Sequence, residues 1–365
     1  YGLMQLGIRK GDCVATITPN RPEWNFLDMA IMQIGAVHVA IYPTISESDY
    51  RHIFDDAGVR LVFVAGWDLL RKITQIIDDK PELKDKVYTF RNLLGYKHLN
   101  EVIELGRANP APQYLQEIKD SIRPDDVVSL VYTSGTTGFP KGVMLTHRNF
   151  LSNVEAILPI IPTAENNRVL SYLPLCHVYE RMMNYSWQYL GIPIYYAESL
   201  ARIQENMVEL KPDIFTTVPR LLEKVYDKIL AQGHKLGKGK RKIFFWANDI
   251  ALQYEENPGK RYRRQLKRAR KLVLNQWNRA LGGNLKVIVT GGAAIQPRIS
   301  RVFWAMGIPV LEGYGTTETS PVIAVSNFFT GGLEIGTAGP VLPGTRVRIA
   351  DDGEILTRGP HVMKG

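Results

Sequence analysis

The chain has 365 residues, of which 45% are hydrophobic and 22% are charged, and its net charge is +9. This composition excludes disordered and fibrous proteins, and the length allows two or more domains of roughly 150 residues each. Cys13 and Cys176 are the only cysteines and have no Cys or His neighbours, which excludes a disulfide framework and a zinc site. No apolar run reaches the roughly 18 to 20 residues of a membrane-spanning helix and no signal-peptide pattern is present, so we expect a cytoplasmic protein.

The first third of the chain alternates β-branched runs with amphipathic segments, the pattern of a parallel sheet covered by helices. Strands are predicted at 13–17, 37–43, 60–65 and 86–90, and helices at 22–34, 46–57 and 67–77. A loop that contains Pro110, Pro112 and Pro124 then leads to the next strand. We therefore expect a first α/β lobe over residues 1–125.

A second α/β lobe is expected over residues 126–330. Its strands are predicted at 127–133, 168–174, 192–197, 213–219, 285–290 and 308–315. A long helical insertion, about residues 220–281, separates two of these strands and is interrupted by glycine-rich turns. Residues 331–365 are predicted to begin a small β-barrel-like subdomain, with a hairpin around Asp352 and Gly353. The expected fold class is thus α/β, with two doubly wound lobes of mostly parallel strands.

A loop that suits phosphate follows the strand at 127–133. Its glycines can turn backbone N–H groups toward an anion, its hydroxyls can donate to phosphate oxygens and its lysine can neutralise charge. The candidate residues are Thr133, Ser134, Gly135, Thr136, Thr137, Gly138 and Lys141. It is not a Walker loop, because Pro140 and Gly142 flank the lysine. The alternative is a flexible polar loop before a helix that starts near Thr146.

A second candidate site combines two glycine-rich turns that follow the strands at 285–290 and 308–315. Both turns are expected at the carboxyl ends of parallel strands, where open α/β sheets bind ligands. Small residues would let a purine lie against backbone, with Tyr314 over its other face, and Glu318 could hold Mg²⁺ beside phosphate. The candidates are Gly291, Gly292, Ala293, Glu312, Gly313, Tyr314, Gly315, Thr316, Thr317 and Glu318. The alternatives are that the glycines at 291 and 292 only form a tight turn and that Glu318 is a solvated charge.

The segment YTSGTTGFPKG (132–142) resembles the signature loop of the adenylate-forming, or AMP-binding, superfamily of acyl-CoA synthetases, luciferases and peptide-synthetase adenylation domains. The segments EGYGTTE (312–318) and GEILTRGP (353–360) follow in the family's order. The resemblance implies ATP and Mg²⁺ as ligands. It also implies that Lys141 and the loop hydroxyls hold phosphates, that Thr317 contacts the α-phosphate and that Glu318 binds the metal.

The segment SYLPLCHVYER (171–181) resembles the LPLxHxxER segment of long-chain acyl-CoA synthetases. The resemblance implies that His177 lies near the substrate carboxylate at the mouth of an acyl tunnel. No Asp occurs between residues 171 and 190, which argues against an amino-acid substrate. Where some bacterial relatives carry a gating Trp, this chain has Arg181, so His177, Arg181 and Trp187 are all candidates for the gate.

The expected reaction is therefore ATP-dependent formation of acyl-AMP from a long-chain fatty acid, followed by transfer of the acyl group to coenzyme A. The resemblance implies that the chain stops before the family's C-terminal lid domain with its adenylation lysine, so we expect weak adenylation. Another acyl or aryl acid is an alternative substrate. A non-catalytic lipid-surface or regulatory module is an alternative from a different class.

Positive charge is concentrated in residues 235–279, which contain 14 Lys and Arg residues and three acidic residues, a local charge of +11. Peripheral contact with an anionic membrane and a solvated helical face are both consistent with this segment. Nucleic-acid binding is not expected, because no nucleic-acid-binding signature accompanies the charge. The sequence carries no indication of oligomeric state.

Overall fold

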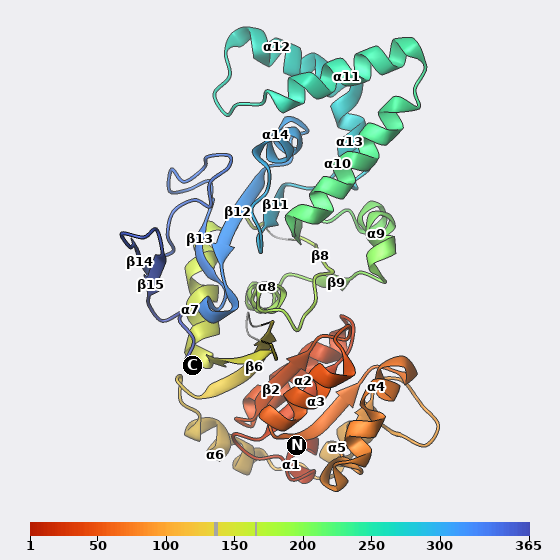
Figure 1. The fold of residues 1–365 in the computed structure, drawn as a ribbon, viewed down its shortest axis with the longest axis vertical. Coiled ribbons are helices and arrows are strands. Elements are labelled where there is room, and N and C mark those ends of the chain that lie inside the picture. The colour runs from red at the N-terminus through yellow and green to blue at the C-terminus, as the bar shows by residue number, and fades with distance from the viewer. Residues whose placement is uncertain (135–137, 165) are drawn as a thin grey trace.

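The computed structural model describes residues 1–134, 138–164 and 166–365. Its described residues form two large twisted sheets, each with helices on both faces, and a small two-stranded sheet (Figure 1). The long helical insertion lies beyond the second sheet, at the end of the molecule remote from the N-terminus. The predicted α/β class is confirmed.

The first sheet has seven strands in the order β5-β4-β3-β1-β2-β6-β7. They are β1 (Cys13–Ile17), β2 (Val37–Ile41), β3 (Val59–Val64), β4 (Val87–Thr89), β5 (Lys97–His98), β6 (Val127–Thr133) and β7 (Lys141–Thr146). All neighbours pair in parallel except β7, which is antiparallel to β6. Every residue of β1 and β2 is buried, as a central parallel sheet covered on both faces requires.

The helices around this sheet are α1 (Gly2–Gln5), α2 (Pro22–Gln33), α3 (Glu47–Asp56), α4 (Trp67–Asp78), α5 (Leu99–Ala108), α6 (Pro112–Ser121) and the short 3₁₀ turn η1 (Pro81–Leu83). Ser46 caps α3 and forms a reciprocal capping box with Asp49. The segment before β6 is more ordered than the expected loop. Pro112 is the first residue of α6, a position that tolerates proline because its missing N–H has no partner in a helix.

The second sheet has six strands in the order β13-β12-β11-β10-β8-β9. They are β8 (Val169–Ser171), β9 (Ile194–Tyr196), β10 (Ile214–Thr217), β11 (Val287–Thr290), β12 (Val310–Gly315) and β13 (Val322–Val325), and only β13 is antiparallel to its neighbour. The surrounding elements are α7 (His147–Ile157), η2 (Leu158–Ile160), α8 (Val178–Tyr189), η3 (Leu200–Arg202), α9 (Ile203–Leu210), α14 (Pro297–Ala305) and η5 (Thr317–Thr319).

Alternate side chains of the second sheet enter two different cores. Val287 and Leu311 pack with α7 and α8, whereas Phe215 and Ile288 pack with the helical insertion. This division follows from the period of two residues in a β-strand. The sheet therefore separates two apolar layers, each of which contains a cavity described below.

The sheets do not follow the domain boundary expected at residues 125/126. Strands β6 and β7 belong to the first sheet, because β6 pairs in parallel with β2 and β7 closes an antiparallel hairpin with β6. Strand β7 was absent from the sequence prediction, which placed a single loop between β6 and the next helix. The division of the chain into domains stays a prediction.

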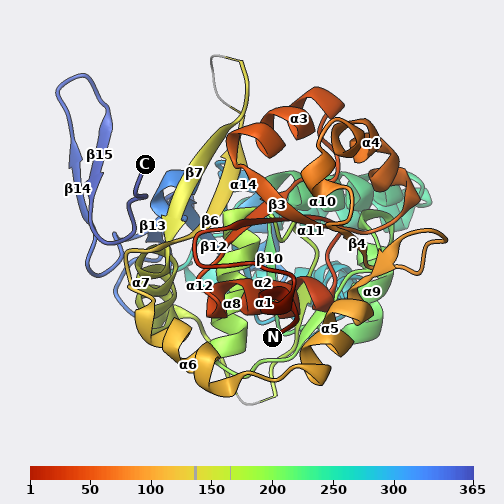
Figure 2. The same ribbon diagram turned by 90° about the horizontal axis from the view of Figure 1, so that it is seen from below.

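The insertion is helical, as predicted, and consists of α10 (Pro219–His234), α11 (Lys238–Leu252), α12 (Lys260–Ala269), the π-helical segment η4 (Arg270–Leu274) and α13 (Asn275–Arg279). The predicted hairpin is formed by β14 (Arg346–Ile349) and β15 (Ile355–Arg358), and it projects from one side of the molecule (Figure 2). Within the described ranges, no helix combines the length and the apolarity needed to cross a bilayer.

Candidate active site

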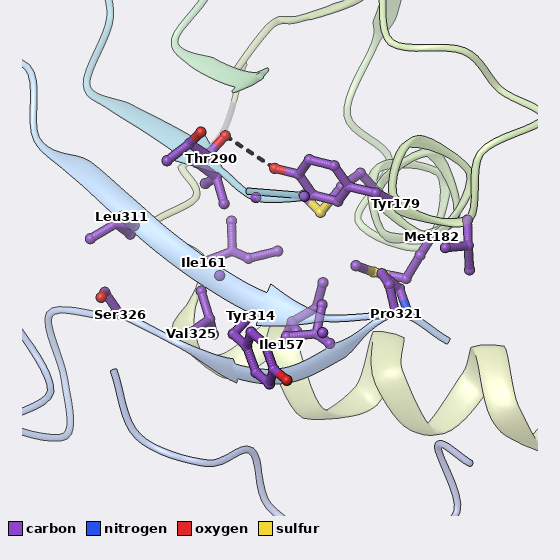
Figure 3. Close-up of a pocket in the computed structure, with 18 of the residues that line it drawn as sticks. Ile157, Ile161, Tyr179, Met182, Thr290, Leu311, Tyr314, Pro321, Val325 and Ser326 are labelled. Carbon is purple, nitrogen blue, oxygen red and sulfur yellow. Dashed lines mark hydrogen bonds between the residues drawn. The ribbon is translucent and has the colours of Figure 1, made fainter. Parts of the chain in front are cut away.

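A largely apolar cavity of about 240 Å³, here the central cavity, lies between the second sheet and the helices α7 and α8 (Figure 3). Its apolar walls come from the end of α7 with η2, from α8 and from strands β11 to β13. These wall residues are Ile157, Ile160, Ile161, Val178, Met182, Met183, Val289, Leu311, Val322 and Val325. These walls suit an apolar group of a ligand, because burial of apolar surface supplies binding energy without directional contacts.

One end of the central cavity is formed by the two predicted glycine-rich turns. Gly291, Gly292 and the segment 313–317 all line it, so the fold brings these predicted residues together. A Cβ on Gly315 would lie 1.7 Å from the carbonyl oxygen of Pro321, so this position cannot accept a side chain without movement of the backbone. Gly292 has a φ of +80°, which favours glycine. The turns thus present bare backbone to the cavity, as a flat ring would require.

Three predicted residues of these turns, Ala293, Glu312 and Glu318, lie outside the lining of the central cavity. Ala293 is exposed, and the Glu312 carboxylate accepts a hydrogen bond from the Gly336 backbone N–H at 3.1 Å. Burial raises the pKa of Glu312. Sequence reasoning also missed Thr290, which lines the cavity and whose buried hydroxyl has no hydrogen-bond partner in the described part of the chain.

His177 is the N-cap residue of α8 and lines the central cavity. Its Nδ1 accepts a hydrogen bond from the Tyr179 backbone N–H at 3.2 Å and so caps the helix. Burial lowers the pKa of His177, so the ring is neutral at pH 7 and its proton is on Nε2. The Tyr179 hydroxyl donates to the Val289 carbonyl at 3.0 Å, and this hydrogen bond holds the Tyr179 side chain against β11 (Figure 3).

A second space of about 360 Å³, here the loop cavity, meets the central cavity at His177 and Thr317, which line both. Its remaining walls include Tyr42 and Ile45 from the first lobe and Thr133 and Ser134 from the start of the predicted phosphate loop. A ligand in the loop cavity and a ligand in the central cavity could therefore come into contact at His177 and Thr317.

The predicted phosphate loop connects the antiparallel strands β6 and β7. Gly138 has a φ of +121°, and Lys141 is exposed at the start of β7, where it pairs in register with Thr133. The Pro140 carbonyl accepts a hydrogen bond from His52 Nε2 at 2.9 Å. The predicted phosphate contacts Gly135, Thr136 and Thr137 lie outside the described residues.

Thr317 and Glu318 belong to the short turn η5, directly after β12. The Thr316 N–H donates to Thr319 Oγ1 at 2.9 Å, and the Glu318 carbonyl accepts from the Met363 N–H at 2.8 Å, so the backbone is held at both ends. No cluster of three or more His, Cys, Asp or Glu side chains that could hold a metal occurs within the described ranges. One carboxylate beside hydroxyls fits Mg²⁺, which takes most of its ligands from phosphate and water.

Comparison with known proteins shows the family of this chain. A family profile described as AMP-binding enzyme matches residues 1–365. The chain belongs to the AMP-binding enzyme family. It is 33% identical over 371 residues to the long-chain-fatty-acid–CoA ligase FadD15 of Mycobacterium bovis, with 100% of this chain and 61% of that protein covered. It is 29% identical to the peroxisomal long chain acyl-CoA synthetase 6 of Arabidopsis thaliana, of which 54% is covered. The chain thus spans little more than half the length of these relatives.

Two solved structures share the fold of this chain. The inhibitor-bound N-terminal domain of FACL13 from Mycobacterium tuberculosis superposes with a TM-score of 0.69 at 21% identity, with 99% of this chain and 79% of that chain covered. The anthranilate CoA ligase AuaEII in complex with anthranoyl-AMP has a TM-score of 0.71 at 20% identity, with 99% and 62% covered. At these identities the likeness shows the fold.

The gate candidates Arg181 and Trp187 line neither the central nor the loop cavity of this AMP-binding enzyme. Both are fully buried. Arg181 Nη2 lies 2.5 Å from Asp28 Oδ1, and Asp28 also contacts His38 Nδ1 at 2.5 Å. Burial alone would raise the pKa of Asp28, but Arg181 and His38 outweigh it and bring the pKa to about 2. The geometry therefore makes Arg181 a structural ion-pair partner.

Glu180 is a buried acid beside His177 to which sequence reasoning assigned no role. Asn184 Nδ2 donates to its Oε1 at 3.2 Å, and the Thr216 hydroxyl lies 3.4 Å from Oε2. Burial raises the pKa of Glu180 to about 7, although these hydrogen bonds oppose the shift. Only the tertiary structure reveals this property, because an acidic side chain is exposed more often than buried.

Proposed function

We propose that this chain provides the nucleotide and acyl sites of a long-chain fatty acid–CoA ligase that forms acyl-AMP from ATP and a fatty acid and then transfers the acyl group to coenzyme A. The observation that carries the proposal is the meeting of the apolar central cavity and the loop cavity at His177 and Thr317. A fatty chain gains about 0.8 kcal/mol for each methylene it buries, so the apolar walls favour a long acid.

In the first step, an oxygen of the fatty carboxylate forms a bond to the α-phosphorus of ATP, and the bond from that phosphorus to the bridging oxygen breaks to release pyrophosphate. We assign the purine to the backbone of Gly291, Gly292 and Gly313, with Tyr314 at its face. Thr317 donates to the α-phosphate, and the neutral His177 donates to the carboxylate or to the oxygen that becomes the acyl carbonyl. A hydrogen-bond donor directed at charge that develops in the transition state typically raises the rate by about 10² to 10³-fold.

The β- and γ-phosphates are assigned to the loop from Thr133 to Lys141, whose lysine neutralises charge. Glu318 would hold Mg²⁺, and the ion would offset charge on the phosphate oxygens when bound. In the second step, the sulfur of coenzyme A bonds to the acyl carbon, AMP leaves and the thiol proton is released. We assign the approach of the thiol to the loop cavity, which meets the central cavity at His177 and Thr317.

The test is acid-dependent exchange of pyrophosphate into ATP, measured on the full-length protein with acids from acetate to oleate and with aromatic acids. We expect exchange to rise with chain length and to fall by about 10²-fold or more in Glu318→Ala. If the exchange rate is highest with short or aromatic acids, the proposed adenylation reaction stands and the proposed long-chain substrate is wrong. Absence of exchange with every acid, together with absence of ATP binding, would favour a non-catalytic module.

We also propose that α12 allows peripheral contact with an anionic membrane. Its exposed cations include Arg263, Arg264 and Lys267, whereas Leu266 and Ala269 pack into the core. Each cation near an anionic surface contributes about 1 kcal/mol. Binding to phosphatidylglycerol vesicles should be lost when the three cations are replaced by Glu, and equal binding to phosphatidylcholine vesicles would refute the proposal.

A further inference from the structure

A third cavity lies on the opposite face of the second sheet from the central cavity. This lateral cavity of about 490 Å³ is bounded by β10 and β11, by α9 and by α10 and α13 of the insertion. Ile288 and Val289 are neighbours on β11, yet Ile288 lines the lateral cavity and Val289 the central one. Successive side chains of a strand point to opposite faces, so the sheet itself separates the two spaces.

The inner walls of the lateral cavity are apolar. Phe215 and Ile288 form the floor on the sheet, and they are register partners in the parallel pair of β10 and β11. Phe303, Trp277 and Met207 add further buried apolar surface from three helices. The volume lies within the range of about 300 to 1,000 Å³ that is usual for small-molecule sites.

One side of the cavity carries positive charge. Arg220, Lys224 and Lys228 are exposed residues of α10 that line the cavity, and their spacing of four residues places them on one face of the helix. Arg220 Nη1 lies 3.3 Å from Glu223 Oε2. Lys224 and Lys228 have no carboxylate within 4.0 Å among residues 1–134, 138–164 and 166–365. The cavity thus combines an apolar interior with two cations that are not matched by acids of the described chain.

We propose that the lateral cavity is a second acyl site, which binds the anion of a long-chain fatty acid with the tail against Phe215 and Ile288 and the carboxylate at Lys224 and Lys228. The charge complementarity selects an anionic head, and the apolar floor selects a hydrocarbon tail. This site lies outside the reaction proposed above and does not depend on it, because the sheet separates it from His177 and Thr317.

The test measures quenching of tryptophan fluorescence by a dibrominated stearic acid below its micellar concentration, because Trp277 lines the lateral cavity. We expect saturable quenching that Trp277→Phe largely removes. The double variant Lys224→Glu with Lys228→Glu should bind at least about tenfold more weakly, since each charge-assisted contact contributes on the order of tenfold. Ala280→Phe, which adds bulk at the cavity wall, should abolish the quenching.

Matched controls separate this site from the others. Lys235→Glu with Lys238→Glu changes the same number of charges on exposed residues outside the cavity lining and should leave the affinity unchanged. Val325→Phe narrows the central cavity and should also leave the Trp277 signal unchanged. Pyrophosphate exchange depends on ligands in the central cavity and not on the lateral cavity. If the proposed reaction is not observed, the quenching assay still tests the lateral site.

Three results would overturn the proposal. They are absence of saturable quenching in the unmodified protein, equal affinity in the Lys224 and Lys228 double variant, and quenching only by brominated phospholipid in vesicles. The last result would assign the cations to a membrane surface. A brominated long-chain alcohol should bind about tenfold more weakly than the acid, because it lacks the charge that the lysines attract.

Discussion

Asp28 on α2 and Arg181 on α8 form an ion pair in which neither side chain is exposed, with 2.5 Å between Oδ1 and Nη2. Tyr185 donates a hydrogen bond to the second carboxylate oxygen at 2.6 Å, and His38 contacts the first. The pair joins a helix of the first sheet to the helix that His177 caps. It therefore couples the packing of the two sheets to the position of a proposed active-site residue.

Replacement of Asp28 by Asn should destabilise the protein severely. The guanidinium of Arg181 would stay buried without a counter-charge, which typically costs about 3 to 5 kcal/mol. Urea unfolding measures this loss. Asp79→Asn is the matched control, because its ion pair with Arg51 is exposed and should contribute less than about 1 kcal/mol. Equal losses in the free energy of unfolding of the two variants would show that the buried ion pair stabilises the protein no more than the exposed one.

Glu180 should make the stability depend on pH. Its pKa in the folded protein is raised to about 7 from a model-peptide value of 4.5, so the folded state holds a proton that the unfolded state releases. Stability should therefore fall as pH rises from about 5 to 8, by on the order of 3 kcal/mol. Glu180→Gln should remove this dependence and become the more stable form at pH 8. Equal free energies of unfolding at pH 5 and pH 8 would contradict the assignment.

His177→Asn should lower acyl-adenylate formation by about 10²-fold while the fold is preserved, because Asn keeps an N-cap acceptor for Tyr179 but lacks the imidazole Nε2–H. His177→Ala should lose both activity and about 1 kcal/mol of stability. Single-turnover assays and thermal unfolding separate these effects. Since the pKa of His177 is lowered, the rate should not fall between pH 8 and pH 7 through protonation of this ring. Full activity of the Asn variant would refute the role.

Val325→Phe should shift substrate preference toward shorter acids. Val325 is half-buried on β13 and lines the central cavity, so the larger ring displaces part of a long chain (Figure 3). Loss of two or three methylene contacts corresponds to about 2 kcal/mol, or roughly 30-fold in kcat/KM for a sixteen-carbon acid. Val208→Phe, on the exposed face of α9, is the control and should leave the chain-length profile unchanged. An unchanged profile in Val325→Phe would place the acyl chain elsewhere.

The sequence by itself predicted the α/β class, most strands and the glycine-rich turns, because hydrophobic period and turn chemistry are local properties. It also predicted that Gly291, Gly313 and Thr317 would share a site, because the carboxyl ends of parallel strands meet at one edge of a sheet. It did not predict β7, since a strand at the edge of a sheet is recognised mainly by its partner, and here the partner β6 lies across a glycine-rich loop.

Only the tertiary structure decided the roles of the charged residues on α8. In the sequence, Glu180 and Arg181 are two adjacent charged residues, and Arg181 is a candidate for the gate. In the fold, Arg181 reaches Asp28 across 153 positions of the chain, and Glu180 is buried beside Thr216. Burial and partner distance set the charge state of such groups, and both depend on segments that are brought together only when the chain folds.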